Sequence, residues 1–208
     1  MELKRVVVTG FGAITPIGNN AKEYWENLVK GESGAAPITL FDATNFKTKF
    51  ACEVKNFNPL DHFDKKEAKK MDRNTQLGLV AAREAVTHSR IIEDNVDKNR
   101  VGVIWGSGIG GLETFETEVL GWANTEMPRF NPFFIPKMIA DITPGHISIE
   151  YGFHGPNYTT VSACASSANA LIDSKMLIQL GKADVIVCGG SERSEEHTSE
   201  LQSHLNLV

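Results

Sequence analysis

Short segments with the composition of β-strands alternate along this chain with segments of helical period, and this alternation restricts the possible folds more than any other feature. The strand-like segments are rich in β-branched and small residues, and they are Val6–Thr9, Val101–Trp105, Tyr158–Ala163 and Ala183–Cys188. Strands that alternate with helices form layered sheets with helices on both faces. We therefore predict an α/β fold.

The helical segments carry recognisable start and stop signals. Asp72 is suited to cap a helix over residues 73–89, which has a stripe of apolar residues at helical spacing. Asn19 or Asn20 is suited to cap an earlier helix that ends at Gly31. Further helices are expected through Phe115 and Val119 and over residues 144–151, whereas residues 31–63 should be irregular with short strands, and residues 124–137 should form a long functional loop.

Cys164 is the strongest candidate for a catalytic side chain. The run G-P-N-Y-T-T-V-S-A-C-A-S-S (155–167) predicts a strand that delivers Cys164 onto the first turn of a helix ending at Gly181. Unpaired N–H groups and the positive end of the helix dipole favour a thiolate there. Ala163 and Ala165 are small enough to let a substrate approach, and the turn resembles the nucleophile elbow of acyl-transfer enzymes on other folds. The alternative is a small, inert, buried thiol.

Composition excludes several other classes of protein. The 208 residues are enough for one sizeable core, and the net charge of −5 argues against general nucleic-acid binding. No apolar run approaches the roughly 20 residues of a membrane-spanning helix, and the first residues lack the apolar core of a signal peptide. Cys52, Cys164 and Cys188 are too few and too widely spaced for a disulfide framework or a metal site, so we expect a cytoplasmic protein without a bound metal.

Several motifs together resemble those of the β-ketoacyl-acyl-carrier-protein synthases, and most of all the synthase II type of fatty acid elongation. They occur in the family's order and cover residues 3–192. The motifs are V-V-V-T-G-F-G-A-I-T-P-I-G (6–18), K-K-M-D-R (69–73), G-S-G-I-G-G (106–111), N-P-F-F-I-P-K-M-I (131–139), G-H-I-S-I-E-Y-G-F-H-G-P-N (145–157), A-C-A-S-S (163–167) and G-G-S-E (189–192).

This resemblance implies a thiolase-like fold, a layered α-β-α-β-α arrangement of two similar halves. Residues 1–192 would form the N-terminal half only. After Glu192 the hydrophobic periodicity stops, and we expect residues 193–208 to be a non-native tail, the translated reading frame of a sequencing-library adapter.

The resemblance also implies a reaction. The residue at the position of Cys164 takes an acyl group from the phosphopantetheine arm of acyl carrier protein, and its own backbone N–H helps to hold the oxyanion. Decarboxylation of malonyl-acyl-carrier protein then gives the carbanion that forms the β-ketoacyl product, and the enzyme itself needs no cofactor. In the family two catalytic histidines lie in the second half, and neither His146 nor His154 replaces them, so this chain alone is expected to be inactive.

Further site residues are implied by the same resemblance. Ile109 matches a position at the floor of the acyl tunnel, and Phe133 and Phe134 match aromatic residues that reach the tunnel of the neighbouring subunit in a homodimer. Without the resemblance each would be an ordinary apolar residue. A patch of lysines matches a segment at the tunnel mouth and would attract the acidic acyl carrier protein, although by itself it describes a solvated helix face; the patch consists of Lys65, Lys66, Lys69 and Lys70.

Other functions are compatible with parts of the sequence. The strand followed by Gly10-x-Gly12 suggests a dinucleotide-binding turn, but Thr15 replaces the third glycine and the acidic residue that binds ribose is missing. A polyketide-type ketosynthase would share the chemistry of Cys164. A non-catalytic chain-length partner subunit would lack the nucleophile, and an incomplete chain would have no function of its own.

Overall fold

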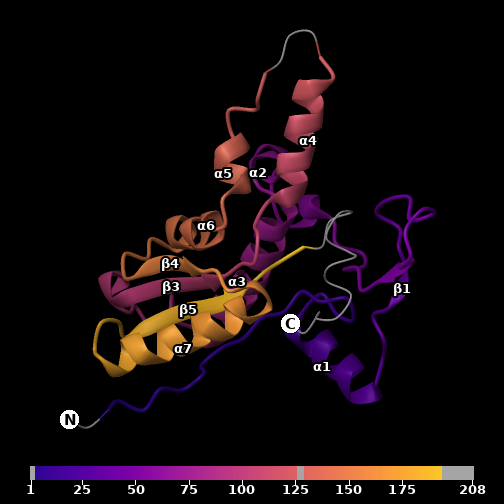
Figure 1. The fold of residues 1–208 in the computed structure, drawn as a ribbon. Coiled ribbons are helices and arrows are strands. Elements are labelled where there is room, and N and C mark those ends of the chain that lie inside the picture. Colours follow the sequence, from indigo (N-terminus) through magenta and orange to yellow (C-terminus); the bar gives the residue numbers. More distant parts are fainter. Residues whose placement is uncertain (1–2, 126–128, 194–208) are drawn as a thin grey trace.

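The computed structural model describes residues 3–125 and 129–193 (Figure 1). Its centre is a three-stranded parallel sheet in the order β4-β3-β5. The strands are β3 (Val101–Gly106), β4 (Asn157–Thr160) and β5 (Val185–Gly190). Every residue of β3 is buried, as expected for the central strand of a covered sheet. Strands are confirmed at these three predicted places, but β4 ends at Thr160 rather than at Ala163, and β5 begins and ends two residues later than predicted.

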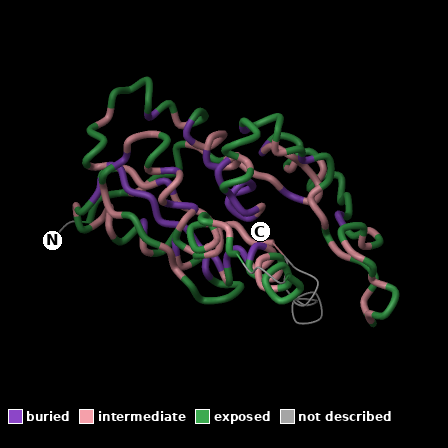
Figure 2. Tube along the Cα trace, turned by 90° about the horizontal axis from the view of Figure 1, so that it is seen from above, coloured by how far each residue is buried: buried purple, intermediate pink, exposed green. Residues whose placement is uncertain are grey.

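Helices cover both faces of this sheet. Alternate residues of β3 point in opposite directions. Val101, Val103 and Trp105 join a core with the helices α3 (Arg73–Ser89) and α6 (Ile142–Tyr151). The residues of β3 between them point to the other face of the sheet, which is covered by α7 (Ser166–Gln179), and Ala170 of α7 is fully buried. The buried residues run through the interior between exposed outer surfaces (Figure 2), so the predicted α/β layering is confirmed.

The predicted helix caps are present. The Asp72 carboxylate accepts a hydrogen bond of 3.0 Å from the backbone N–H of Asn74, and its other oxygen accepts one of 2.6 Å from the buried hydroxyl of Thr114. Helix α1 (Ala21–Lys30) is capped by Asn20 rather than Asn19 and ends at Gly31, whose φ of 73° favours glycine. The helices predicted through Val119 and over residues 144–151 are also observed, as α4 and α6.

The remaining elements are short. Strands β1 (Ala36–Pro37) and β2 (Phe50–Ala51) pair in the segment predicted to be irregular. The prediction of one long loop over residues 124–137 is wrong at its end, because α5 begins at Phe134 and packs against α4. The other elements are the 3₁₀ turns Pro59–Asp61, Lys98–Arg100 and Ala163–Ala165 and the helices α2 (Lys65–Lys70), α4 (Leu112–Ala123) and α5 (Phe134–Met138).

The predicted buried strand Val6–Thr9 is also wrong. This segment has no strand pairing among the described residues, and the side chains of Val7 and Val8 are 60% and 81% exposed. The following Gly10 and Gly12 lie against the backbone of α3, where a Cβ would come within 2.3 Å and 2.1 Å of carbonyl oxygens. A run of β-branched residues forms a buried strand only beside a partner strand and under a covering layer, and the described chain supplies neither here.

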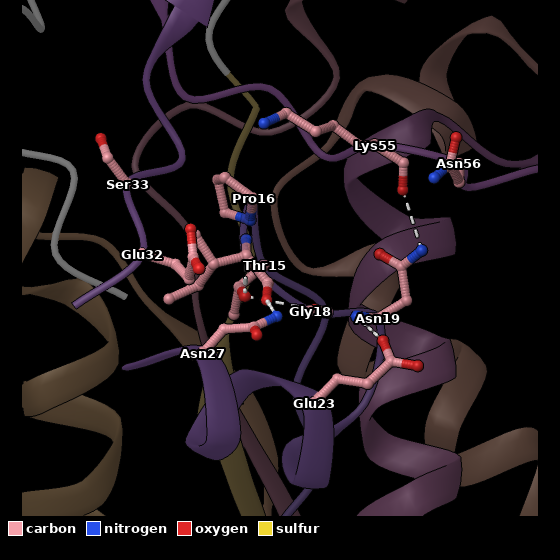
Figure 3. Close-up of a pocket in the computed structure, with 11 residues that line it drawn as sticks. Thr15, Pro16, Gly18, Asn19, Glu23, Asn27, Glu32, Ser33, Lys55 and Asn56 are labelled. Atoms are coloured by element: carbon pink, nitrogen blue, oxygen red, sulfur yellow. Dashed lines mark hydrogen bonds between the residues drawn. The ribbon is translucent and has the colours of Figure 1, made fainter. Parts of the chain in front are cut away.

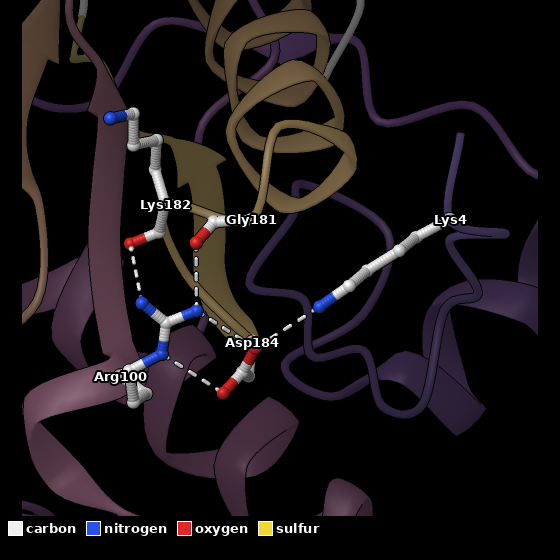
Figure 4. A network of polar contacts seen from close by, with 5 residues as sticks. All are labelled: Lys4, Arg100, Gly181, Lys182 and Asp184. Carbon is white, nitrogen blue, oxygen red and sulfur yellow. Dashed lines mark hydrogen bonds and ion pairs between the residues drawn. The ribbon is translucent and has the colours of Figure 1, made fainter. Parts of the chain in front are cut away.

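An ion-pair network closes the amino end of the sheet (Figure 4). Arg100, just before β3, donates two hydrogen bonds of 3.0 Å to Asp184 and one of 2.9 Å to the carbonyl of Gly181. The two hydrogen bonds from Arg100 to the Asp184 carboxylate, with Lys4 at 3.6 Å from the same carboxylate, lower the pKa of Asp184. The network joins the start of β3 to the turn between α7 and β5.

The predicted tail cannot be compared with the structure. Residues 194–208 lie outside the described residues, so the boundary at Glu192 stays a prediction. Arg193 is described, and its guanidinium pairs with the carboxylate of Glu113.

Candidate active site

The carboxyl ends of β3, β4 and β5 lie side by side, because the three strands are parallel and in register. Gly106, Thr160 and Gly190 are neighbours at this edge. Ligands and reactive groups gather at such edges in open α/β sheets. Three predicted motifs therefore meet here: G-S-G-I-G-G follows β3, A-C-A-S-S follows β4, and Ser191 and Glu192 follow β5.

Cys164 lies at this edge of the sheet and is exposed. It sits in the 3₁₀ turn Ala163–Ala165, and α7 begins two residues later. The prediction that Cys164 lies in the first turn of the long helix is therefore wrong, because the residue lies in a short 3₁₀ turn just before α7. The chain bends at Ala163, whose φ of 51° is unusual for a residue with a Cβ. Cys164 nevertheless remains at the amino end of α7.

Two glycines let α7 approach the sheet closely. A Cβ on Gly106 would stand 2.3 Å from the backbone nitrogen of Ser167, and one on Gly190 would stand 2.6 Å from the Cβ of Ser167. No side chain fits at either position without moving the helix. The amino end of α7, and with it the turn that carries Cys164, is thus set directly on β3 and β5.

The loop after β3 is held by Glu192. The carboxylate of Glu192 accepts hydrogen bonds of 2.6 Å and 2.9 Å from the backbone N–H groups of Gly108 and Ile109. Ile109 is 49% exposed, and the neighbouring Gly108 faces Ala163 across the edge. The structure therefore brings Ile109 to the same edge as Cys164. The role of Glu192 was not predicted; the signal in the sequence is a carboxylate two positions after the glycines that end β5.

A second hydrogen-bonded chain fixes the end of β5. The indole of Trp105 donates a hydrogen bond of 2.9 Å to the hydroxyl of Ser191. That hydroxyl donates one of 2.6 Å to the side-chain oxygen of Asn74 at the start of α3. Strands β3 and β5 and helix α3 are thereby locked together behind Glu192.

The predicted lysine patch and one predicted aromatic residue meet elsewhere on the surface. All four lysines are exposed on α2, and the ammonium of Lys70 lies 5.3 Å from the ring centre of Phe133. Phe133 is itself exposed, whereas Phe134 is partly buried and stacks with Phe115 and Phe130. The lysine patch is therefore continuous with Phe133; Lys65, Lys66, Lys69 and Lys70 are its members.

Two of the described histidines, His146 and His154, belong to the motif that precedes the strand leading to Cys164. Burial lowers the pKa of His146, which is on α6. The backbone N–H of His154 bonds to Lys98 at the amino end of β3, away from the edge that carries Cys164. Among the described residues, no group of three or more His, Cys, Asp or Glu side chains is arranged to hold a metal ion. Within the same ranges, no helix combines the length and the apolar character needed to cross a membrane.

One hollow in the described surface is formed by residues that no prediction placed in the site. It has a volume of about 280 Å³ and lies between the loop at Thr15–Asn19, α1 and Lys55 (Figure 3). Its walls are tied by hydrogen bonds from the amides of Asn27 and Asn19 to the carbonyls of Ile17 and Lys55, at 2.6 Å and 2.8 Å. None of the predicted site residues lines it.

Comparison with known proteins gives consistent matches. A family model described as the N-terminal domain of beta-ketoacyl synthase matches residues 3–203. The 3-oxoacyl-[acyl-carrier-protein] synthase 2 of Staphylococcus aureus (strain N315) is 47% identical over 195 residues, which are 93% of this chain and 47% of that protein. The protein of the same name from Synechocystis sp. (strain ATCC 27184 / PCC 6803 / Kazusa) is 42% identical, over 92% of this chain and 46% of its own length. This chain thus spans about half the length of the curated relatives it matches.

Solved structures match in the same way. The ishigamide ketosynthase/chain length factor gives a TM-score of 0.86 at 29% identity, over 97% of this chain and 50% of that one. A type II polyketide acyl-carrier protein in complex with its ketosynthase bound to the hexaketide gives 0.78 at 25% identity, over 96% and 54%.

Proposed function

Because this chain belongs to the β-ketoacyl synthase family, we propose that the complete protein condenses acyl chains in fatty acid elongation, with Cys164 as the acyl-carrying nucleophile. The chain has a thiolase-like fold, since its structural neighbours are thiolase-like ketosynthases with the same α/β architecture. The observation that carries the proposal is the exposed thiol of Cys164 at the amino end of α7, where three strand ends meet.

The proposed reaction has two steps. The Cys164 thiolate attacks the thioester carbonyl of acyl-acyl carrier protein, and the phosphopantetheine thiolate leaves, so that one thioester replaces another. Malonyl-acyl carrier protein then loses carbon dioxide, and the electron pair of the broken C–C bond forms the new bond to the acyl carbon. The Cys164 thiolate departs and the β-ketoacyl product stays on the carrier. The phosphopantetheine belongs to the carrier protein, so the enzyme supplies no cofactor of its own.

The first step can be tested by acylation. When the complete protein is incubated with an acyl thioester of acyl carrier protein, we expect the acyl mass on the peptide that contains Cys164. Cys52 is also exposed and is an internal control for simple accessibility. Acyl transfer to both cysteines alike, or to Cys52 alone, would contradict the assignment of the nucleophile.

We propose that the carrier protein docks on the lysine patch of α2. Four exposed ammonium groups, with Phe133 beside Lys70, offer both charge and an apolar contact to an acidic partner. The polyketide ketosynthase neighbour was solved with its own acyl-carrier protein, which supports a partner of this kind.

Charge reversal on α2 should affect carrier-bound substrates selectively. We expect Lys66→Glu together with Lys69→Glu to lower kcat/KM for acyl-acyl carrier protein by about tenfold or more, because opposite charges steer the encounter. Activity with small acyl thioesters should be unchanged. The matched control is the same change at Lys22 and Lys30, two exposed lysines of α1. An equal loss with both kinds of substrate would rule out a docking role.

Further points of the proposal follow from the same features. The backbone of β4 is unpaired on its outer side among the described strands, which supports a homodimer, and sedimentation of the complete protein measures this. The polyketide neighbours keep a polyketide ketosynthase as the second candidate, and the length of the products made from malonyl-acyl carrier protein separates the two.

Cys164 argues against a non-catalytic chain-length subunit. The free thiols of Cys52, Cys164 and Cys188 support a cytoplasmic location.

A further inference from the structure

We infer that Ser166 is a positioning residue for the nucleophile: its buried hydroxyl fixes the turn that aims Cys164. The inference rests on the proposed role of Cys164 and adds a residue to it. Ser166 is only 3% exposed, although it is the first residue of α7 and only two positions from the exposed Cys164.

The hydroxyl of Ser166 joins both ends of the bend that precedes Cys164. It accepts a hydrogen bond of 2.9 Å from the backbone N–H of Ser162 and donates one of 2.7 Å to the carbonyl of Ala163. The carbonyl of Ser107 lies 3.2 Å away. Since one hydroxyl hydrogen cannot donate fully to two acceptors, the shorter bond to Ala163 is the main one.

The bend needs such support. The backbone of Ala163 is left-handed, with φ of 51°, and a residue with a Cβ in this region is held there by its surroundings. The Ser166 hydroxyl pairs the N–H before Ala163 and the carbonyl of Ala163 itself, so it restrains the backbone on both sides of the strained residue. The next residue is Cys164, whose thiol direction and backbone N–H direction follow from that backbone.

Ser166 is in turn anchored to the sheet. Its own carbonyl accepts a hydrogen bond of 2.7 Å from the hydroxyl of Thr160 at the end of β4. The longer contact, with the carbonyl of Ser107, reaches the loop after β3. The backbone N–H of Ser107 in turn donates a hydrogen bond of 3.2 Å to the carbonyl of Thr160. The carbonyl of Ser166 thus connects the turn of Cys164 to the end of β4, and its hydroxyl reaches the loop after β3, a contact that capping α7 alone would not require.

The first test measures alkylation by iodoacetamide in the complete protein. We expect Ser166→Ala to lower the rate at Cys164 relative to Cys52 by about tenfold, since the hydrogen bonds that restrain Ser162 and Ala163 are both lost. The matched control is Ser174→Ala, which removes an equally buried hydroxyl from the same helix; Ser174 donates to Ala170 at 2.6 Å within α7. Ser174→Ala should leave the ratio of the two rates unchanged.

The second test separates positioning from a general loss of structure. With acyl-acyl carrier protein as the substrate, we expect Ser166→Ala to lower kcat by about tenfold and to leave KM within about twofold. Thermal unfolding of both variants is measured alongside. An unchanged ratio of alkylation rates in Ser166→Ala overturns the inference, and so does an equal fall in both variants or a rise in KM with kcat unchanged.

The outcome also distinguishes this inference from the proposed function. If Cys164 of the unaltered protein takes no acyl group, the proposed function fails, whatever Ser166 does. If Cys164 is acylated and alkylated equally well with Ser166→Ala, the proposed function stands and the positioning role alone is lost.

Discussion

Replacing Cys164 with alanine in the complete protein should lower the rate of condensation by about 10⁴-fold or more, because the covalent route is removed and only binding and oxyanion stabilisation remain. The residue is exposed and lies between two alanines, so the substitution leaves no buried cavity. We therefore expect the free energy of unfolding to change by less than about 0.5 kcal/mol. The measurement is the release of carbon dioxide from malonyl-acyl carrier protein together with formation of the β-ketoacyl product.

Cys52→Ala is the matched control. It removes a second exposed thiol, which directly follows β2 and belongs to none of the motifs that meet at the edge of the sheet. Its activity should equal that of the unaltered protein. Condensation that persists at an undiminished rate in Cys164→Ala would show that another group carries the acyl chain.

Gly106→Ala should be the most destabilising small substitution in the described chain around the site. The added Cβ would lie 2.3 Å from the nitrogen of Ser167 and 2.4 Å from the carbonyl carbon of Ser166. Both are backbone atoms, so the clash is relieved only if the whole amino end of α7 moves away from β3. We expect a loss of about 3 kcal/mol in the free energy of unfolding, measured by urea denaturation.

A glycine elsewhere provides the control for this substitution. Gly121 lies in α4, and no atom stands within 4 Å of the position its Cβ would take. Gly121→Ala should therefore stabilise the helix by about 0.5–1 kcal/mol, because alanine loses less backbone entropy on folding. Equal effects of the two substitutions would mean that α7 is not packed on Gly106 as described.

The sequence predicted those parts of the fold that depend on residues close together in the chain. Asp72 marks the start of α3, and Gly31 follows the end of α1, because capping depends on residues a few positions apart. The strand β3 could be predicted because a fully covered strand is apolar at every position. The failures have the opposite cause. Val6–Thr9 has the composition of a buried strand, but its pairing depends on distant parts of the chain that the segment itself does not encode.

The candidate site divides in the same way. The motif around Cys164 predicts the nucleophile, and the structure places that residue in a short turn just before α7. The contacts that shape the site could not be predicted, because they join residues far apart in sequence: Glu192 bonds to Gly108, and Ser166 reaches Ser107. The left-handed bend at Ala163 was also unexpected, since alanine gives no signal for such a conformation.

The position of β3 between two later strands has a consequence for how the chain folds. Neither neighbour of this strand exists until more than half of the described chain has been made, and the hydrogen bond from Ser191 to Asn74 spans 117 positions. Each such pairing closes a long loop before it gains any contact energy, which slows assembly and leaves the apolar strand uncovered meanwhile. During synthesis β3 therefore has no partner strand until β4 is made and keeps one edge unpaired until β5 is made, and that interval is when the nascent chain is most exposed to aggregation.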